Sequence, residues 1–390
     1  FGPVANVSVL VLNQPAASIT LTNTAGAFSI TNVLPPYDLA ILSPAFHQAT
    51  IYRGLTRPDP TLSIEPNPNP EATASLVGTV AAGAGFPEGA TTTSRLSLHN
   101  KGGFTGINRT PSSTDSSWSD TNYPWVGPSP IDVVLHVLEW TFDVNNHPVT
   151  FTRFGTATKT GVTPGAVLTG IDVPVSTVAS TGTLSGTVTA PAGYNLPSVS
   201  IGVTFAPGFT GGPSIDAGDV LPIDGLSSLT NGQFSFHTPV IPNTDFVVFS
   251  ASSDPFGFTS FNRKGLAANA TGVNLVIPEH PTQLLPPNGG FASTGTLFAW
   301  TAPTQSVSRL RLFVPGFEVD VVQEASQLEL PDLSEIGFSI PAGSPCGWVV
   351  DSFGTFSSID DAAGPGGLRA PAAADEFLGS SNGANCTGSP

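Results

Sequence analysis

Glycine and proline interrupt this chain so often that few stretches can form a long helix. The 390 residues include 42 glycines and 38 prolines, and both residue types destabilise the interior of a helix. The residues between these breaks are rich in Val, Thr, Ser and Phe, which favour short strands and tight turns. Charged residues, which exposed helices need in runs, make up only 10% of the chain. The sequence therefore predicts an all-β protein.

Internal repeats indicate that the chain contains several related β-domains. The sequence LVGTVAAGAGFPEG at Leu76–Gly89 is similar to LSGTVTAPAGYNLP at Leu184–Pro197. A second pair is AGAFSITNVLPPYDLAI at Ala25–Ile41 and NGQFSFHTPVIPNTDFVVF at Asn231–Phe249. Each repeat combines apolar strand sequences with Gly or Pro turns. A chain of this length is expected to hold about two to four domains.

Similar endings and Pro-rich joints mark the boundaries between these domains. Three segments end alike, at Thr61–Pro66, Thr169–Val175 and Thr271–Glu279. The predicted domains are residues 1–68, 69–177, 178–280 and 281–390, called below the first, second, third and last segments. The joints EPNPNPE at Glu65–Glu71 and PEHPTQLLPP at Pro278–Pro287 favour extended backbone. We therefore expect an extended arrangement of domains.

The first three segments resemble the carboxypeptidase regulatory-like domain. The resemblance lies in the order of a GTV strand, a turn, an FSI strand and a strand of the type V-x-P-P-Y-D-L. It is carried by Ala25–Ile41 and by Leu184–Phe249. The resemblance implies small prealbumin-like β-sandwiches that serve as accessory modules and carry no catalytic residues.

The last segment resembles a fibronectin type III-like sandwich. Its TLFAWTAP sequence at Thr296–Pro303 places Trp300 where that family keeps a core tryptophan, and CGWVVDSFG at Cys346–Gly354 resembles a closing strand. We expect Trp300 and Trp348 to be buried. Together the two resemblances imply a bacterial multi-domain surface protein, built from tandem Ig-like and prealbumin-like β-sandwiches in an extended arrangement.

The charge of the chain excludes several classes of partner. It has 12 basic and 28 acidic residues, for a net charge of −16, and no Lys or Arg occurs between Lys159 and Arg263. Because a basic patch is missing, no nucleic-acid partner is expected. The apolar runs are of strand length, so no membrane-spanning helix is expected.

The cysteine count and the first residue favour a secreted protein. The chain has no Met and begins with Phe1, which we interpret as the removal of an initiator and a signal peptide. Cys346 and Cys386 are an even count that fits one disulfide in an oxidising compartment, and two buried free thiols are the alternative. The expected localisation is extracellular, at a cell surface.

Sequence motifs for catalysis and for cofactor binding are absent. No two of the six histidines have the spacing of metal ligands, and the chain has no Gly-x-Ser-x-Gly elbow, phosphate-binding loop or dinucleotide fingerprint. The chain is therefore predicted not to be an enzyme and to need no cofactor. Glu139 is singled out among the carboxylates, because glycoside hydrolysis uses a facing carboxylate pair.

Acidic clusters are weak candidates for calcium binding. Asp216, Asp219 and Asp224 lie close together in sequence and could supply oxygen ligands, and Asp360 with Asp361 forms a second cluster. Neither has the spacing of a known calcium loop, so a solvated acidic loop is the favoured interpretation of both.

The candidate ligand site is a polar stretch with three aromatic residues. Trp118, Tyr123 and Trp125 lie among Ser, Asp and Pro, which predicts a loop that contacts a partner. The leading hypothesis is an extracellular structural protein, a subunit of a surface filament, sheath or appendage that self-associates into a homopolymer through β-strand contacts. The alternative is a secreted adhesin or carbohydrate-binding protein that binds surface glycans or other cell-surface proteins; an unrecognised hydrolase is the third hypothesis.

The first segment lacks the GTV strand that opens the later repeats. A sandwich without this edge strand would leave backbone N–H and C=O groups unpaired beside an open strip of core. Either Val4–Leu12 supplies the missing strand, or a neighbouring subunit adds one. We expect the second, with Val7, Val9 and Val11 on the subunit-contact strand.

Overall fold

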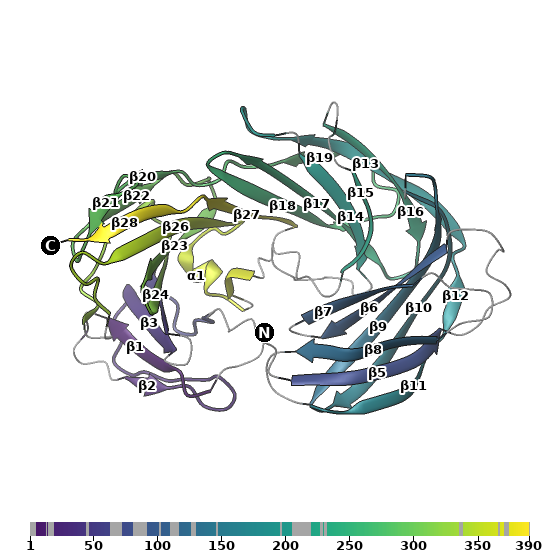
Figure 1. Cartoon of the computed structure of the whole chain (residues 1–390), viewed down its shortest axis with the longest axis horizontal. Helices are drawn as coiled ribbons and strands as arrows, with labels where there is room; N and C mark the ends of the chain where they lie inside the picture. The colour runs from purple at the N-terminus through teal and green to yellow at the C-terminus, as the bar shows by residue number, and fades with distance from the viewer. Residues whose placement is uncertain are drawn as a thin grey trace.

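The computed structural model describes most of the chain, and its regular structure is almost entirely β-strand. The described residues are 5–12, 14, 19–43, 47–62, 72–80, 92–100, 103–109, 117–125, 130–145, 147–195, 197–204, 220–226, 229, 232–334, 338–365, 367–369 and 374–389. Within them, the helical elements are α1 (Ile359–Ala362) and a 3-10 turn at Gly367–Arg369. The chain is all-β, as its composition predicts, and Figure 1 shows its strands arranged along an arc.

Each segment contributes its own set of strands. The first segment contains β1 (Ser8–Leu12), β2 (Thr20–Leu21), β3 (Tyr37–Ser43) and β4 (Gln48–Leu55). The second contains β5 (Ala72–Val80), β6 (Thr92–Asn100), β7 (Gly103–Arg109), β8 (Ser117–Trp125), β9 (Ile131–Phe142), β10 (Pro148–Val162), β11 (Val167–Val173) and β12 (Val175–Thr177). The third contains β13 (Ser180–Thr189), β14 (Ser198–Thr204), β15 (Val220–Leu226), β16 (Gln233–Val240), β17 (Asp245–Asp254), β18 (Gly257–Leu266) and β19 (Val273–Val276). The last contains β20 (Gln283–Leu285), β21 (Gly290–Ala292), β22 (Leu297–Trp300), β23 (Ser306–Val314), β24 (Phe317–Gln323), β25 (Gln327–Glu329), β26 (Pro345–Gly354), β27 (Asp375–Ser381) and β28 (Ala384–Gly388).

A 14-stranded sheet joins strands of the third, last and first segments. Its order is β15-β14-β17-β18-β27-β26-β23-β24-β4-β3-β1-β2, with β28 beside β26 and β21 beside β28. At one seam, β18 of the third segment pairs antiparallel with β27 of the last. At the other seam, β4 of the first segment pairs parallel with β24 of the last. Smaller sheets complete the fold, in the orders β12-β10-β9-β6-β7, β11-β5-β8, β16-β13-β19 and β20-β22-β25.

The core of the last segment contains the two tryptophans expected there. Trp300 and Trp348 are both buried, which confirms that prediction. The Trp348 ring meets Phe298 edge to face, with ring centroids 5.2 Å apart. The indole N–H of Trp300 donates to Ser308 Oγ at 3.0 Å, so this buried donor is satisfied.

The first segment forms part of the core of the last segment on both faces of its sheet. Successive residues of a strand point to opposite faces, and here both faces are covered. Leu10 and Ile51 pack in one cluster with residues of the last segment, including Trp348. Val9 and Tyr52 pack in another cluster that also contains residues of the last segment. Strands that are apolar on both faces need other residues packed against both faces, and residues of the last segment contribute to that packing on each face.

This packing differs from the separate first domain that the repeats predict. In the described residues, β1 to β4 form a single layer within the 14-stranded sheet. The β4 strand pairs in parallel with β24 of the last segment, so the first segment has a strand partner within the same chain. The reason is physical: β4 has apolar residues at consecutive positions, which suits a strand buried inside a sheet and not one at its margin.

The joint between the second and third segments is also packed. Trp140 and Phe151 of the second segment lie in the same apolar cluster as Phe236 of the third. The Phe151 ring stacks on His237 of β16, with ring centroids 5.6 Å apart. The segments are therefore held by shared side-chain contacts in addition to the chain that connects them.

Candidate functional site

The seam between the first and last segments carries a row of polar side chains across the sheet. Gln48 Nε2 on β4 donates to Asp320 Oδ2 on β24 at 3.2 Å. Arg309 on β23 lies 3.9 Å from Asp320 and donates from Nη2 to Asp351 Oδ2 on β26 at 2.7 Å. Asp351 Oδ1 in turn accepts from Ser380 Oγ on β27 at 2.7 Å. The row thus runs from the first segment through the last towards the third.

These charged groups are almost fully buried, so their pairing is obligatory. Arg309 is 9% exposed, Asp320 1% and Asp351 5%. Burying an ion costs roughly several kcal/mol of free energy, and only close charged or hydrogen-bonding partners in fixed positions offset that cost. A slip of β4 against β24 would separate Gln48 from Asp320, so the row favours one register of the parallel pair.

A second set of contacts attaches the end of the first segment to α1. The Asp360 carboxylate accepts the backbone N–H of Thr56 at 2.8 Å, and the Asp360 carbonyl accepts from Arg57 Nη1 at 2.6 Å. Burial opposes ionisation of Asp360, but the hydrogen bonds from Thr56 and Arg57 outweigh it and lower its pKa. Thr61 N–H also donates to the carbonyl of Ala363 at 2.7 Å. Asp360, considered above as part of an acidic cluster, thus serves here to bind the first segment.

The seam between the third and last segments contains a buried ion pair. Lys264 Nζ on β18 contacts Glu376 Oε1 on β27, and Glu376 is 0% exposed. Burial raises the pKa of Glu376 to about 7, although Lys264 acts in the opposite direction. At the neighbouring position, Arg263 Nε pairs with Asp375 Oδ1 at 2.5 Å. Both seams are therefore joined by backbone pairing and by charged side chains.

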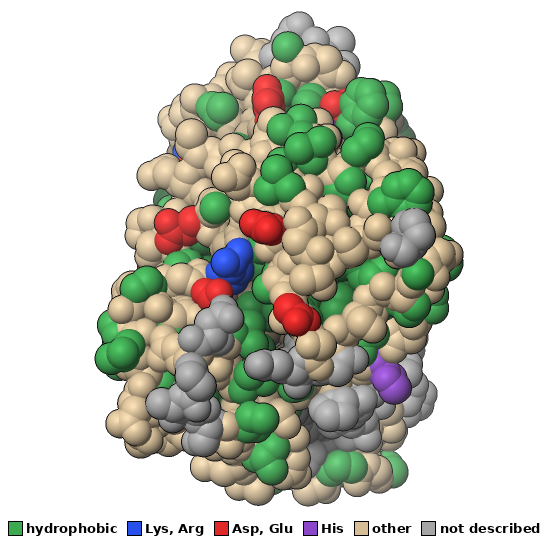
Figure 2. All heavy atoms as spheres, turned by 90° about the vertical axis from the view of Figure 1, so that its left-hand side faces the viewer, with side chains coloured by type: hydrophobic (Ala, Val, Ile, Leu, Met, Phe, Trp, Pro, Cys, Tyr) green, Lys and Arg blue, Asp and Glu red, His purple; other side chains and the backbone are tan. Residues whose placement is uncertain are grey.

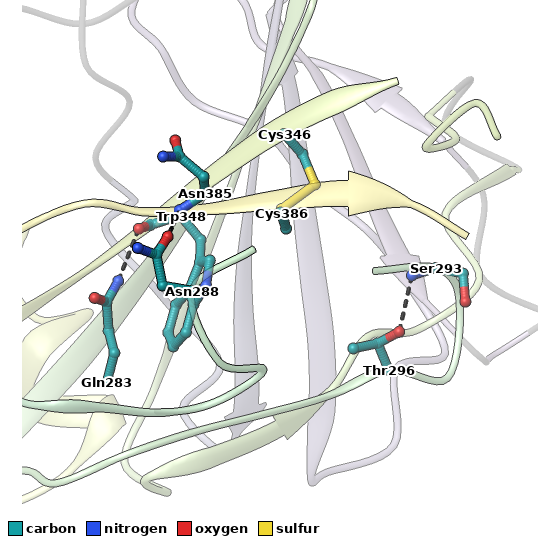
Figure 3. The surroundings of a disulfide bond; sticks show 8 residues. All are labelled: Gln283, Asn288, Ser293, Thr296, Cys346, Trp348, Asn385 and Cys386. Carbon is teal, nitrogen blue, oxygen red and sulfur yellow. Dashed lines mark hydrogen bonds between the residues drawn. A yellow bond between two sulfur atoms is a disulfide. The ribbon is translucent and has the colours of Figure 1, made fainter. Parts of the chain in front are cut away.

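The predicted cysteine pair is a disulfide in the structure. Cys346 on β26 and Cys386 on β28 are register partners, with Cα atoms 4.8 Å apart and a sequence separation of 40. Figure 3 shows the polar contacts nearby: Gln283 Nε2 donates to the Trp348 carbonyl at 2.8 Å, and Asn288 Oδ1 accepts from Asn385 N–H at 2.9 Å. The disulfide and the Asn288–Asn385 bond hold β28 in place, and the Gln283 bond joins β20 to β26.

The three aromatic residues predicted to form a partner loop lie on a strand. Trp118, Tyr123 and Trp125 belong to β8, which pairs antiparallel with β5 at the margin of a three-stranded sheet. The expectation of a loop is therefore corrected: pairing with β5 outweighs the preference of Ser, Asp and Pro for loops. A ligand-binding role for these residues stays a prediction.

The candidate subunit-contact residues, which lie on β1 and immediately before it, are buried within the chain. Val7, Val9 and Val11 all lie in the cluster shared with the last segment. Their side chains thus pack against residues of the last segment and are not free at the surface. A subunit contact through the first segment stays a prediction, and it must involve the whole segment and not these side chains alone.

The calcium candidates fall partly outside the described part of the chain. Asp216 and Asp219 lie among residues that the structure does not describe. Asp224 lies on β15 and pairs with His147 of the second segment, Oδ1 to Nδ1, at 2.9 Å. The hydrogen bond to Asp224 raises the pKa of His147, with partial burial acting against it. Asp224 is therefore engaged in a contact between segments.

The remaining carboxylate candidate has a structural partner. Glu139 is buried on β9, and its Oε1 accepts from Arg153 Nη2 on β10 at 2.7 Å. Among the described residues, no group of three His, Cys, Asp or Glu side chains could hold a metal ion. In the same part of the chain, no helix is long and apolar enough to cross a membrane.

The surface offers shallow features. A depression of about 400 Å³ over β13 and β16 is lined mainly by small and polar residues, including Ser185, Gly186 and Gln233. Figure 2 shows one end of the molecule, where hydrophobic side chains and acidic groups both reach the surface. The exposed apolar residues of the last segment belong to β20, β21 and β22: Leu284, Leu285, Phe291 and Leu297. The strand pairing and the shared cores between segments are therefore the features on which a proposal about function can rest.

Comparison with known proteins finds low similarity. No family of known proteins matches the chain, and no curated protein matches it. A candidate cell adhesion protein from Bacteroides eggerthii is 11% identical over 54% of this chain and 88% of its own, with a TM-score of 0.20. Another from Bacteroides fragilis is 13% identical over 59% and 97%, with a TM-score of 0.15. A tetra-tandem repeat from the extending region of a large adhesion protein is 12% identical over 99% and 92%, with a TM-score of 0.16. At these TM-scores the likenesses carry no argument about fold or function.

Proposed function

We propose that this chain is an extracellular structural protein without catalytic activity, and that it is the subunit of a surface filament, sheath or appendage assembled through β-strand contacts. The observation that carries the proposal is the 14-stranded sheet, which continues through three segments. Domains joined by small polar interfaces move against one another by default. Here backbone pairing at β18–β27 and at β4–β24 would transmit force between segments.

Covalent and apolar contacts support the same role. The disulfide between Cys346 and Cys386 fixes the last strand, and such bonds persist in oxidising surroundings outside the cell. The second and third segments share a core around Trp140 and Phe236, so their joint resists bending. A stiff, disulfide-closed unit is suited to repeated assembly on a surface.

Electron microscopy and sedimentation of the purified chain test the proposal. We expect regular filaments or sheets that grow with protein concentration, and a sedimentation coefficient that rises with them. Particles that stay single over a hundredfold range of concentration would contradict a subunit role.

A second candidate function is adhesion through surface glycans or other cell-surface proteins. It is favoured by the placement of Trp118, Tyr123 and Trp125 together on β8, since aromatic rings bind sugar faces. A glycan array with the parent and Trp118→Ala distinguishes the two candidates. The matched control is Phe256→Ala, an exposed aromatic residue of the third segment. Binding that Trp118→Ala alone removes would favour adhesion.

A further inference from the structure

We propose that subunits exchange their first segments, so that residues 5–62 of one chain dock onto the last segment of the next copy. The proposal rests on the proposed function and names the contact that would build the polymer. The exchanged contact is the β4–β24 seam, with the apolar clusters on both of its faces. The partner is therefore a second copy of this chain.

The first segment is attached to one part of the molecule and packed on another. In sequence it leads through residues 63–71 into β5 of the second segment. In space its β4 pairs with β24 of the last segment, and Figure 1 shows β1 and β3 beside that segment, on the other arm of the arc from β5. The chain connection therefore does not by itself determine which copy supplies the last segment.

The docking contacts are the same whether one chain or two chains make them. They include the backbone pairing of Gln48–Tyr52 with Glu318–Val322, the Gln48–Asp320 hydrogen bond and the bonds of Asp360 to the end of the first segment. Exchange of an identical element between copies leaves these contacts unchanged. The equilibrium between self-docked and exchanged first segments therefore depends on the local concentration of subunits and on the chain that connects the first segment to β5. Subunits gathered at a surface have the high local concentration that favours exchange.

The order of synthesis also favours exchange. Gln48 and Asp320, which meet at the seam, are 272 residues apart in sequence. The first segment is therefore complete long before its own docking site exists, and contacts of such long range form slowly. An undocked first segment exposes apolar residues on both faces of β1 and β4, which makes it prone to pair with any open site. A neighbouring chain whose last segment is already folded offers that site first.

Exchange of this kind yields an open chain of subunits. The donated surface lies on the first segment and the accepting surface on the last, so the contact is head to tail when each subunit receives from a copy other than the one to which it donates; mutual exchange between two copies would close a dimer instead. Each subunit then gives one segment and receives one. The row from Gln48 through Asp320 to Arg309 would set the register of every junction in the same way.

Cysteine cross-linking distinguishes exchange from self-docking. Ala49 on β4 and Val319 on β24 are register partners, and both are buried. Cells that co-secrete an Ala49→Cys chain and a Val319→Cys chain should yield a disulfide-linked mixed dimer on a non-reducing gel. The double variant, Ala49→Cys with Val319→Cys, should yield a ladder of covalent multimers. A second register pair, Ile51→Cys and Val321→Cys, must give the same pattern.

A cysteine pair at the β18–β27 seam is the control for this experiment. At the other seam Ser260 and Leu378 are register partners, and the double variant Ser260→Cys with Leu378→Cys should run as a monomer. Double variants at β4–β24 that run only as internally linked monomers, with no mixed dimer, would overturn the exchange. If filaments still form in that case, the proposed function stands and this inference alone fails. If neither filaments nor mixed dimers form, both fail.

Discussion

One buried carboxyl group, that of Glu376, should govern part of the pH dependence of stability. Glu376 lies on β27, is 0% exposed and contacts Lys264 on β18. Burial raises its pKa from an ordinary 4.5 to about 7, with Lys264 acting to lower it. In the described residues, no hydrogen-bond donor contacts its Oε2. Glu376→Gln keeps the shape and an oxygen acceptor for Lys264 but cannot titrate.

The sign and size of the effect follow from this shift. Between pH 4.5 and 7 the unfolded state has lost the proton of Glu376 while the folded state retains it, so the free energy of unfolding falls as pH rises. The shift from 4.5 to about 7 corresponds to about 3 kcal/mol. This loss is absent below pH 4.5 and complete once the pH has risen above about 7. The parent should therefore lose about 3 kcal/mol relative to Glu376→Gln across that range.

Urea unfolding followed by tryptophan fluorescence at a series of pH values measures this difference. The denaturation midpoint and its slope give the free energy of unfolding at each pH. Glu279→Gln is the matched control, because Glu279 is exposed and its variant should follow the parent. If Glu376→Gln retains the full pH dependence of the parent, the reasoning from burial is refuted.

Other changes test the core, the disulfide and the joint between the second and third segments. Trp300→Ala should reduce the free energy of unfolding by about 3–5 kcal/mol, and a neutral effect in urea would contradict its place in the core. Replacing Cys346 and Cys386 by Ala should cost about 4 kcal/mol, since the bond closes a 40-residue separation; free thiols in the native protein, detected by mass, would contradict the pairing. NMR titration should find the pKa of His147 above its ordinary value, and Asp224→Asn should lower that pKa. The pair stabilises the folded state at acidic pH, and this stabilisation is lost as the pH rises through the raised pKa. An unchanged His147 titration in Asp224→Asn would show that the bond between segments is not made.

Local sequence patterns predicted the all-β fold and much of the core. Gly and Pro are frequent, and Val and Thr lie between them. This composition disfavours long helices whatever the order in which the strands pair. The burial of Trp300 and Trp348 follows from apolar alternation in short strands, which the chain shows without reference to distant residues. Such predictions succeed because the controlling interactions lie within a few residues.

Apart from the disulfide, the features that depend on distant pairing were not predicted. The contact of β4 with β24 joins residues that have no shared local signal. The aromatic residues of β8 have the polar neighbours of a loop, yet pairing with β5 holds them in a strand. A signal for the seam does exist in hindsight: Asp320 is a carboxylate within an apolar strand, such a group needs buried polar partners, and Gln48 on β4 is one of them.

The buried polar contacts at the two seams explain how segments far apart in sequence join in one register. Apolar strands buried on both faces are attractive in several alignments, because most slips still bury hydrophobic side chains. A buried ion without its partner is strongly unfavourable, so each charged pair penalises the slipped alignments more than the correct one. Lys264 and Glu376 act in this way at β18–β27. At β4–β24 the neutral amide of Gln48 donates a hydrogen bond to the buried Asp320 carboxylate, and a slip of β4 would remove that bond. A sheet assembled from separate segments requires such selection at each seam, whether its strands come from one chain or from two.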